Sequence, residues 1–226
     1  TGGDGNDVVL TAKATRELDF GDAPSSYGTM LDEDGARHFA TGPALGTGRD
    51  SEPDGIASIF GDGDDIADAN VQINGTASAV NDEDGVTQTS LSDGATTMTI
   101  YAGQEIVFSI QVANAVSGAA NLDAWIDWNA NGTFDFDERI AARQAVVNGV
   151  NTFTFTAPTE EKVSLGTTYA RFRVSTAGTP DPTGLAEDGE VEDYTINVVA
   201  FNDPPTIASQ SKLTLTEDSE TTNFIL

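Results

Sequence analysis

Residues Asp127 to Glu138 read Asp-Trp-Asn-Ala-Asn-Gly-Thr-Phe-Asp-Phe-Asp-Glu and lie between two stretches that read as β-strands. The oxygen-bearing residues are spaced as in a twelve-position calcium-binding loop. These candidate ligands are Asp127, Asn129, Asn131, Asp135 and Glu138, with the backbone carbonyl of Thr133 at position 7. Gly132 stands at position 6, where the chain must turn sharply. We predict a Ca²⁺ site here, carried by strands and not by helices. A metal-free polar turn is the alternative.

An alternation of apolar and polar residues runs from residue 96 to about residue 200, and it predicts about seven short strands. They are centred on 98–100, 106–112, 122–126, 145–147, 153–155, 170–174 and 194–198. Turn residues separate them at 101–103, 148–149 and 157–158. We therefore predict an all-β fold, an antiparallel β-sandwich of Ig-like or jelly-roll type. The only helix expected is a single turn near 158–161.

Residues 17–95 are poor in apolar side chains and rich in Asp-Gly turns. These dipeptides lie at 34–35, 54–55, 62–63 and 84–85. Asp-Gly favours tight surface turns, but neighbouring carboxylates also collect oxygens around a cation. Scattered apolar residues such as Phe20, Tyr27 and Phe39 argue against a disordered linker. We predict a long irregular segment that packs onto the sandwich and is ordered by calcium.

The chain of 226 residues is strongly acidic, with 37 acidic against 10 basic residues and a net charge of −27. So much uncompensated charge repels itself in a compact fold, and divalent cations would relieve the repulsion. Without a basic patch, nucleic acid is excluded as a partner. The absence of cysteine excludes disulfides and thiolate chemistry. No apolar run approaches the roughly 18–20 residues of a membrane span. The composition fits a secreted bacterial β protein.

A second acidic group leads into the last predicted strand and includes Asp188, Glu190, Glu192 and Asp193. Buried carboxylates need a counter-charge, which leaves two alternatives. One is a cross-strand salt bridge to Arg171 and Arg173. The other is a second calcium site joining the turn at 188–192 to the segment 19–22 or 82–84. Its candidate ligands are Asp19, Asp22, Asp82, Asp84, Asp188 and Glu190.

The two ends of the sequence predict separate segments. Residues 2–10 fit one glycine-rich nonapeptide of the RTX β-roll type, although a single copy cannot build a roll. We assign 1–16 to a leader, 17–200 to the calcium-binding module, and 201–226 to a linker with the first strand of a following module. Both ends read as cuts in a longer chain.

Six short segments occur in order at 19–27, 34–38, 82–86, 124–129, 168–173 and 188–194. The last one contains Gly189-Glu190-Val191-Glu192-Asp193. Together, over about residues 17–200, they resemble the GEVED domain of large secreted bacterial proteins and adhesins. The sequence from Asn202 onward resembles the start of a cadherin-like repeat. The resemblance implies an extracellular, surface-associated, calcium-dependent β module. It does not imply a known catalytic activity. Asn129 and Asn131 depart from an all-aspartate loop and predict weak affinity, about 10⁻⁴–10⁻³ M.

Several features of the sequence bear on other functions. Paired carboxylates suit a glycoside hydrolase, but so many acids make chance pairs common. His38 is the only histidine, and it is accompanied by no nucleophile elbow of the Gly-x-Ser-x-Gly type. Asp181-Pro182 and Asp203-Pro204 leave self-cleavage open. Trp125 and Trp128 flank the loop, so one could serve a calcium-dependent lectin. We predict a non-enzymatic, monomeric calcium-binding module of an adhesin that presents or spaces a ligand-binding surface, with a glycan or host-cell ligand as partner.

Overall fold

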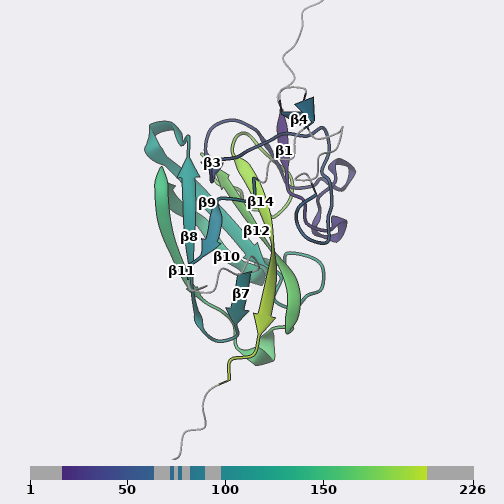
Figure 1. Ribbon diagram of the computed structural model, residues 1–226, viewed down its shortest axis with the longest axis vertical. Coiled ribbons are helices and arrows are strands. Elements are labelled where there is room, and N and C mark those ends of the chain that lie inside the picture. The colour runs from purple at the N-terminus through teal and green to yellow at the C-terminus, as the bar shows by residue number, and fades with distance from the viewer. Residues whose placement is uncertain (1–16, 64–71, 74–75, 78–81, 90–97, 203–226) are drawn as a thin grey trace, which may run out of the picture.

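The computed structural model describes residues 17–63, 72–73, 76–77, 82–89 and 98–202. Within them, two large sheets form the body of the molecule (Figure 1). The first has the order β10-β9-β12-β14-β7, and the second has the order β11-β8-β3 with β6 also paired to β8. Their bounds are β3 Ala44–Leu45, β6 Val86–Gln88, β7 Met98–Tyr101, β8 Glu105–Ala113, β9 Ala119–Ile126, β10 Arg139–Val147, β11 Gly149–Thr156, β12 Gly166–Ser175 and β14 Glu190–Val199. The all-β prediction is confirmed, and all seven predicted strands are present.

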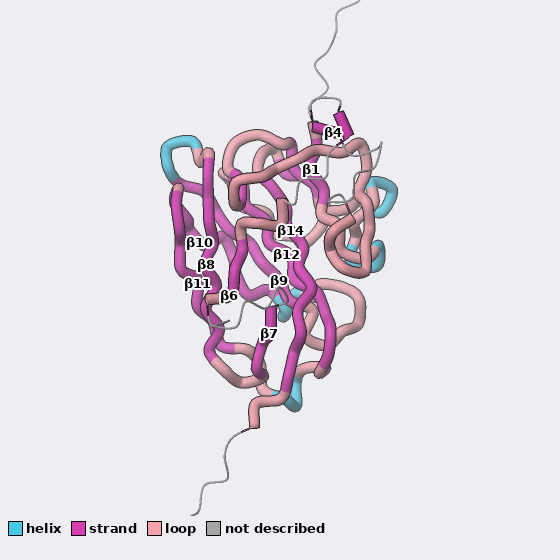
Figure 2. The backbone as a smooth tube through the Cα atoms, viewed as in Figure 1, coloured by secondary structure: helices cyan, strands magenta, loops and turns pink. Residues whose placement is uncertain are grey.

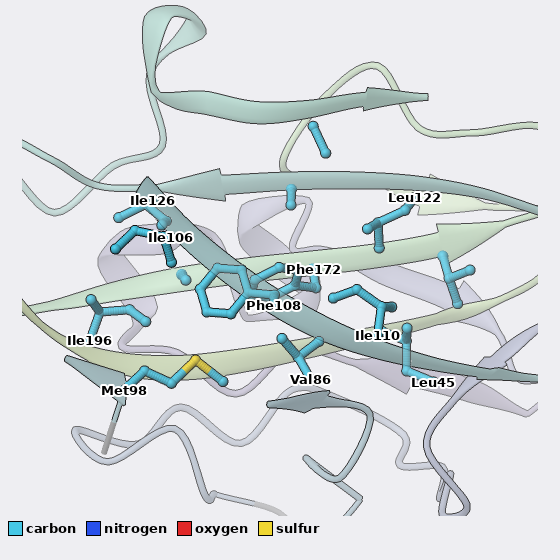
Figure 3. Close-up of a cluster of buried hydrophobic side chains, with 14 of the residues drawn as sticks. Leu45, Val86, Met98, Ile106, Phe108, Ile110, Leu122, Ile126, Phe172 and Ile196 are labelled. Carbon is cyan, nitrogen blue, oxygen red and sulfur yellow. The ribbon is translucent and has the colours of Figure 1, made fainter. Parts of the chain in front are cut away.

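The apolar core lies between these two sheets (Figure 3). Alternation places every second residue of β8, β9 and β12 in this layer, because successive side chains of a strand point to opposite faces. The Phe108 ring of β8 meets the Phe172 ring of β12 edge-on, with centroids 5.6 Å apart. Both side chains are fully buried. Removing either ring would cost about 3–5 kcal/mol.

Strand direction departs from the prediction at one edge. Most pairings are antiparallel, but β14 and β7 run parallel, with Ile196 opposite Met98. β7 continues directly into β8 of the other sheet, so it does not form a hairpin with its neighbour in the sheet. The chain crosses between sheets again at Asn148, the single residue between β10 and β11. The choice between an Ig-like and a jelly-roll sandwich stays a prediction.

A third, thinner layer covers the outer face of the five-stranded sheet (Figures 1 and 2). It contains a small sheet of β1 (Leu18–Phe20), β2 (Arg37–Phe39) and β13 (Leu185–Ala186), in which β13 runs parallel to β2. It also contains the 3₁₀ turns η1 (Ser25–Tyr27) and η2 (Leu31–Glu33). Residues 17–63 are therefore irregular but packed. Sequence reasoning missed that 17–95 also supplies β3 and β6 to the second large sheet.

The remaining elements are short. They are β4 (Gln72–Ile73), β5 (Thr76–Ala77), η3 (Val116–Gly118), η4 (Phe136–Glu138) and η5 (Glu160–Lys162). The turn η5 agrees with the helical turn expected near 158–161, whereas the 3₁₀ turns η1 to η4 were not predicted. The RTX-like nonapeptide, the predicted module after residue 203 and the Asp203-Pro204 bond lie outside the described residues. Among the described residues, no helix is long and apolar enough to cross a membrane.

Candidate metal centre

Three carboxylates from distant parts of the chain converge beside the first residue of β14. Asp19 is the middle residue of β1, Asp82 precedes β6, and Glu190 begins β14. One oxygen from each lies within 4.8 Å of the other two. Calcium binds oxygens at about 2.3–2.6 Å, so two oxygens on opposite sides of the ion are about 5 Å apart. The three oxygens therefore have a spacing that suits one Ca²⁺ ion.

The cluster of Asp19, Asp82 and Glu190, called here the acidic trio, is closed to solvent. Their exposed fractions are 2%, 5% and 0%. Glu190 Oε2 accepts a hydrogen bond from the Leu45 N–H, whereas Glu190 Oε1 has no hydrogen-bond partner among the described residues. Burial, and then the negative charges of Asp19, Glu192 and Asp82, raise the pKa of Glu190 well above its usual value. A cation at this point would replace the proton that such a carboxyl holds.

Backbone hydrogen bonds hold the trio in place. Asp19 Oδ2 accepts the Val191 N–H at 2.8 Å, which ties β1 to β14. Asp82 Oδ2 accepts the Asp50 N–H at 3.0 Å. Because these contacts use main-chain donors, the positions of the carboxylates follow from the path of the chain. The arrangement thus depends on the third layer being docked.

More buried acids surround the trio. Glu192 accepts the Gly85 N–H at 2.8 Å and the Tyr194 hydroxyl at 3.0 Å. Burial and the nearby charges of Asp82 and Asp84 raise its pKa as well. Glu52 accepts the Phe20 N–H. Sequence reasoning did not assign Glu52 or Asp50 to the site, although the acidic turn beginning at Glu52 was a usable signal.

The other three predicted ligands of this region lie outside the trio. Asp22 accepts the Gly63 N–H at 2.7 Å. Asp84 accepts the Thr47 N–H at 2.8 Å, and Asp188 accepts the Thr176 N–H at 2.9 Å. Each of these carboxylates joins two separate stretches of the chain by a hydrogen bond to a backbone N–H. Of the six candidates, the structure brings together Asp19, Asp82 and Glu190.

The predicted cross-strand salt bridge to an arginine is formed by one acidic residue of this group. Arg171 and Asp193 lie opposite each other in the β12–β14 register and form a fully buried ion pair. Arg173 instead donates to the His38 ring at 3.0 Å and to backbone carbonyls such as that of Thr183 at 2.7 Å. Glu190 forms no ion pair within the described part of the chain. The salt bridge is therefore formed by Asp193, whereas Asp19, Asp82 and Glu190 form a cluster that could hold a metal ion.

The loop 127–138 folds into a compact turn between β9 and β10, and its last three residues form η4. Asp127 accepts the N–H groups of Asn131 and Gly132 at 3.2 and 2.9 Å. Glu138, at position 12, accepts the N–H groups of Trp128 and Asp135, both at 2.9 Å. Gly132 has φ of 86°, a left-handed value that suits glycine. The predicted sharp turn at position 6 is therefore present.

The outer part of this loop is polar and exposed. Asn129 Oδ1 accepts the Asn131 N–H at 2.9 Å, and Asn131 Oδ1 accepts the Thr133 N–H at 2.9 Å. Asp135 Oδ2 accepts from the Asn131 amide at 2.8 Å. Burial raises the pKa of Glu138. The six predicted ligands thus line one turn, and binding of calcium there stays a prediction.

Aromatic packing anchors the loop to the third layer. The Tyr27 hydroxyl donates to Asp127 Oδ2 at 2.7 Å, and the Tyr27 ring lies 4.8 Å from that of Phe134. Burial and the hydrogen bond to Asp127 raise the Tyr27 pKa. Both tryptophans are buried: Trp128 faces the main core, and Trp125 packs beside Tyr27. Neither can serve as an exposed stacking platform, so that argument for a lectin site is removed.

The sequence comparison adds a family to this geometry. Residues 121–197 match the GEVED domain. This chain contains a GEVED domain. The match covers β9 to most of β14, a narrower stretch than the resemblance over 17–200. No curated protein matches the chain.

The three acidic residues in the Gly-Glu-Val-Glu-Asp stretch of this GEVED domain make different contacts. Glu190 belongs to the acidic trio, Glu192 accepts the Gly85 N–H, and Asp193 pairs with Arg171. Val191 is buried and donates its N–H to Asp19. The motif therefore lies at the contact between the third layer and the five-stranded sheet. GEVED domains are typical of bacterial surface and secreted proteins.

Proposed function

We propose that this chain is a calcium-binding extracellular module of a large bacterial surface protein. In this proposal, one Ca²⁺ ion binds Asp19, Asp82 and Glu190, and a second binds the loop 127–138. The ions lock the third layer to the sandwich and stiffen the module. The protein has no enzymatic activity in this proposal and serves as a monomeric spacer or ligand-presenting domain within a longer chain. It binds no nucleic acid and does not insert into the lipid bilayer.

The observation that carries this proposal is that Glu190 lies beside two further buried carboxylates, while its Oε1 has no hydrogen-bond partner among the described residues. Leaving such an oxygen uncompensated is costly. Calcium is favoured over a softer metal because every ligand atom in the trio is a carboxylate oxygen. The net charge of −27 also favours uptake of a divalent cation.

Calorimetric titration of metal-free protein with CaCl₂, together with thermal melting, tests the proposal. An ion that binds only the folded protein stabilises it by about 2.7 kcal/mol at a hundredfold excess over its Kd. We expect the Tm to rise with calcium concentration. Glu190→Gln should remove one ion from the binding stoichiometry, and Asp127→Asn should weaken the other site.

The matched control is Glu105→Gln, which changes an exposed glutamate at the start of β8. This variant should bind calcium as the unchanged protein does. A Tm that is the same in millimolar calcium and in chelator would refute the proposal. So would an unchanged stoichiometry in Glu190→Gln.

A further inference from the structure

A pocket of about 350 Å³ lies where the third layer meets the loop 127–138. Figure 2 shows the 3₁₀ turns of this layer on the side of the five-stranded sheet away from β8 and β11. The pocket is lined by Ser25, Ser26, Tyr27, Gly28, Glu33, Thr133, Phe134, Pro182 and Thr183. Its volume is at the lower end of the range of about 300–1,000 Å³ for small-molecule sites. A ligand of one or two rings would therefore fill it.

Arg171 does not line this pocket, but it holds residues that do. Its Nη1 donates to the carbonyls of Tyr27, Gly28 and Pro182 at 2.9, 3.0 and 3.0 Å. Its other donors bind Asp193. Two chain segments that line the pocket are thus fixed to one buried guanidinium. The site is preorganised, which lowers the entropic cost of binding a ligand.

The pocket lining offers hydrogen-bonding groups that the fold does not use. The side chains of Ser25, Ser26, Glu33 and Thr183 form no hydrogen bond within the described residues. Of these, Ser25, Ser26 and Glu33 are exposed. Hydroxyl groups both donate and accept, and a carboxylate accepts. Beside them lie the rings of Tyr27 and Phe134, which are largely buried (6% and 8% exposed) and offer only small apolar areas. The pocket therefore combines hydroxyls, one carboxylate and apolar ring surface.

The charge around the pocket limits which class of ligand it can bind. No arginine, lysine or histidine is among the described residues that line the pocket, and the nearby Arg171 guanidinium is neutralised by Asp193. With Glu33 in the lining and a net charge of −27 on the chain, anionic ligands are disfavoured. One carboxylate is a weak basis for selecting a cation. A purely apolar ligand would leave the hydroxyls without partners.

We propose that this pocket binds one or two units of a neutral saccharide. Sugar hydroxyls meet Ser25, Ser26, Thr183 and Glu33, and the apolar face of the sugar ring contacts Pro182 and the small exposed parts of Tyr27 and Phe134. This site is separate from the acidic trio and does not use either tryptophan. The inference goes beyond calcium binding, and neither proposal requires the other.

Saturation-transfer NMR tests this inference, with the methyl glycosides of glucose, galactose, mannose and N-acetylglucosamine as probes at millimolar concentration in calcium buffer. We expect at least one neutral glycoside to bind and methyl glucuronide, which is anionic, to bind at least tenfold more weakly. Ser26→Phe should fill the pocket and abolish binding. Glu33→Gln should weaken binding at least threefold without filling the pocket.

The matched control is Thr156→Phe, which places the same ring on an exposed position of β11. This variant should bind as the unchanged protein does. Binding that survives in Ser26→Phe, or no binding of any of the four neutral glycosides, would overturn the inference. The calcium titration of the same samples is an independent readout, so failure of the saccharide site is distinguishable from failure of the calcium sites.

Discussion

Asp193 accepts two hydrogen bonds from Arg171, from Nε to Oδ1 at 2.8 Å and from Nη2 to Oδ2 at 2.7 Å. Both side chains are fully buried. Asp193 Oδ2 also accepts the Ala23 N–H at 2.9 Å. This pair therefore joins neighbouring strands of the five-stranded sheet and holds the third layer on its outer face. Its two-point geometry is the stronger form of an ion pair.

Breaking this pair should destabilise the protein strongly. Asp193→Asn leaves the buried Arg171 charge uncompensated, and the expected loss in the free energy of unfolding is about 3–5 kcal/mol. Urea unfolding followed by tryptophan fluorescence measures it. The control is Asp34→Asn, which breaks an exposed pair with Arg37 and should cost only about 0.2–1 kcal/mol. Equal losses in the two variants would contradict the structural role assigned to Asp193.

Gly189 should tolerate no side chain. A Cβ there would lie 1.8 Å from the Val174 carbonyl oxygen, and its φ is 114°. Gly189→Ala should cost more than about 4 kcal/mol, a loss that marks a severe local conflict. Gly118 has φ of 76° and nothing within 4 Å of an added Cβ, so Gly118→Ala should cost only the backbone strain of about 1–3 kcal/mol. Thermal melting of both variants separates the clash from the strain.

His38 should stay neutral well below pH 6.5. Burial, and then the charge of Arg173, lower its pKa well below the usual value. Its Nε2 accepts from Arg173, so its Nδ1–H donates to the Asp188 carbonyl. A lowered histidine pKa contributes stability above pH 6.5 that is lost as the pH falls, by about 1.4 kcal/mol per pH unit.

The pH dependence of urea unfolding measures this effect against His38→Gln, which should lack that part of the slope. Because His38 is the only histidine, its imidazole signal in the NMR spectrum is unambiguous. We expect no titration between pH 8 and 6. An imidazole that titrates near pH 6.5 would contradict the buried position.

Two phenylalanines of the loop 127–138 should behave in opposite ways. Phe134 is 8% exposed and packs on Tyr27, whereas Phe136 is 94% exposed. Phe134→Ala should cost about 3–5 kcal/mol and weaken calcium binding, because the loop loses its anchor. Phe136→Ala should stay within about 0.5 kcal/mol of the unchanged protein. Calorimetric titration and melting of the two variants compare them, and a larger loss from Phe136→Ala would show that the anchor is misassigned.

Local pattern in the sequence determined much of this protein. Alternation around Phe108, Phe172 and Ile196 predicted the strands and the core, because a strand must bury one face. The spacing from Asp127 to Glu138 predicted a sharp turn, and Gly132 has the conformation this requires. These features depend on residues that are close in sequence, so they can be predicted without the tertiary structure.

Tertiary structure alone decided which acids meet. Val191 donates to Asp19 across 172 residues of sequence, and Ala23 donates to Asp193 across 170 residues. Carboxylates in different turns look alike in a sequence, because turn propensity does not depend on what lies opposite. Only the tertiary structure shows that Asp193 pairs with Arg171, whereas Glu190 lies beside two further carboxylates.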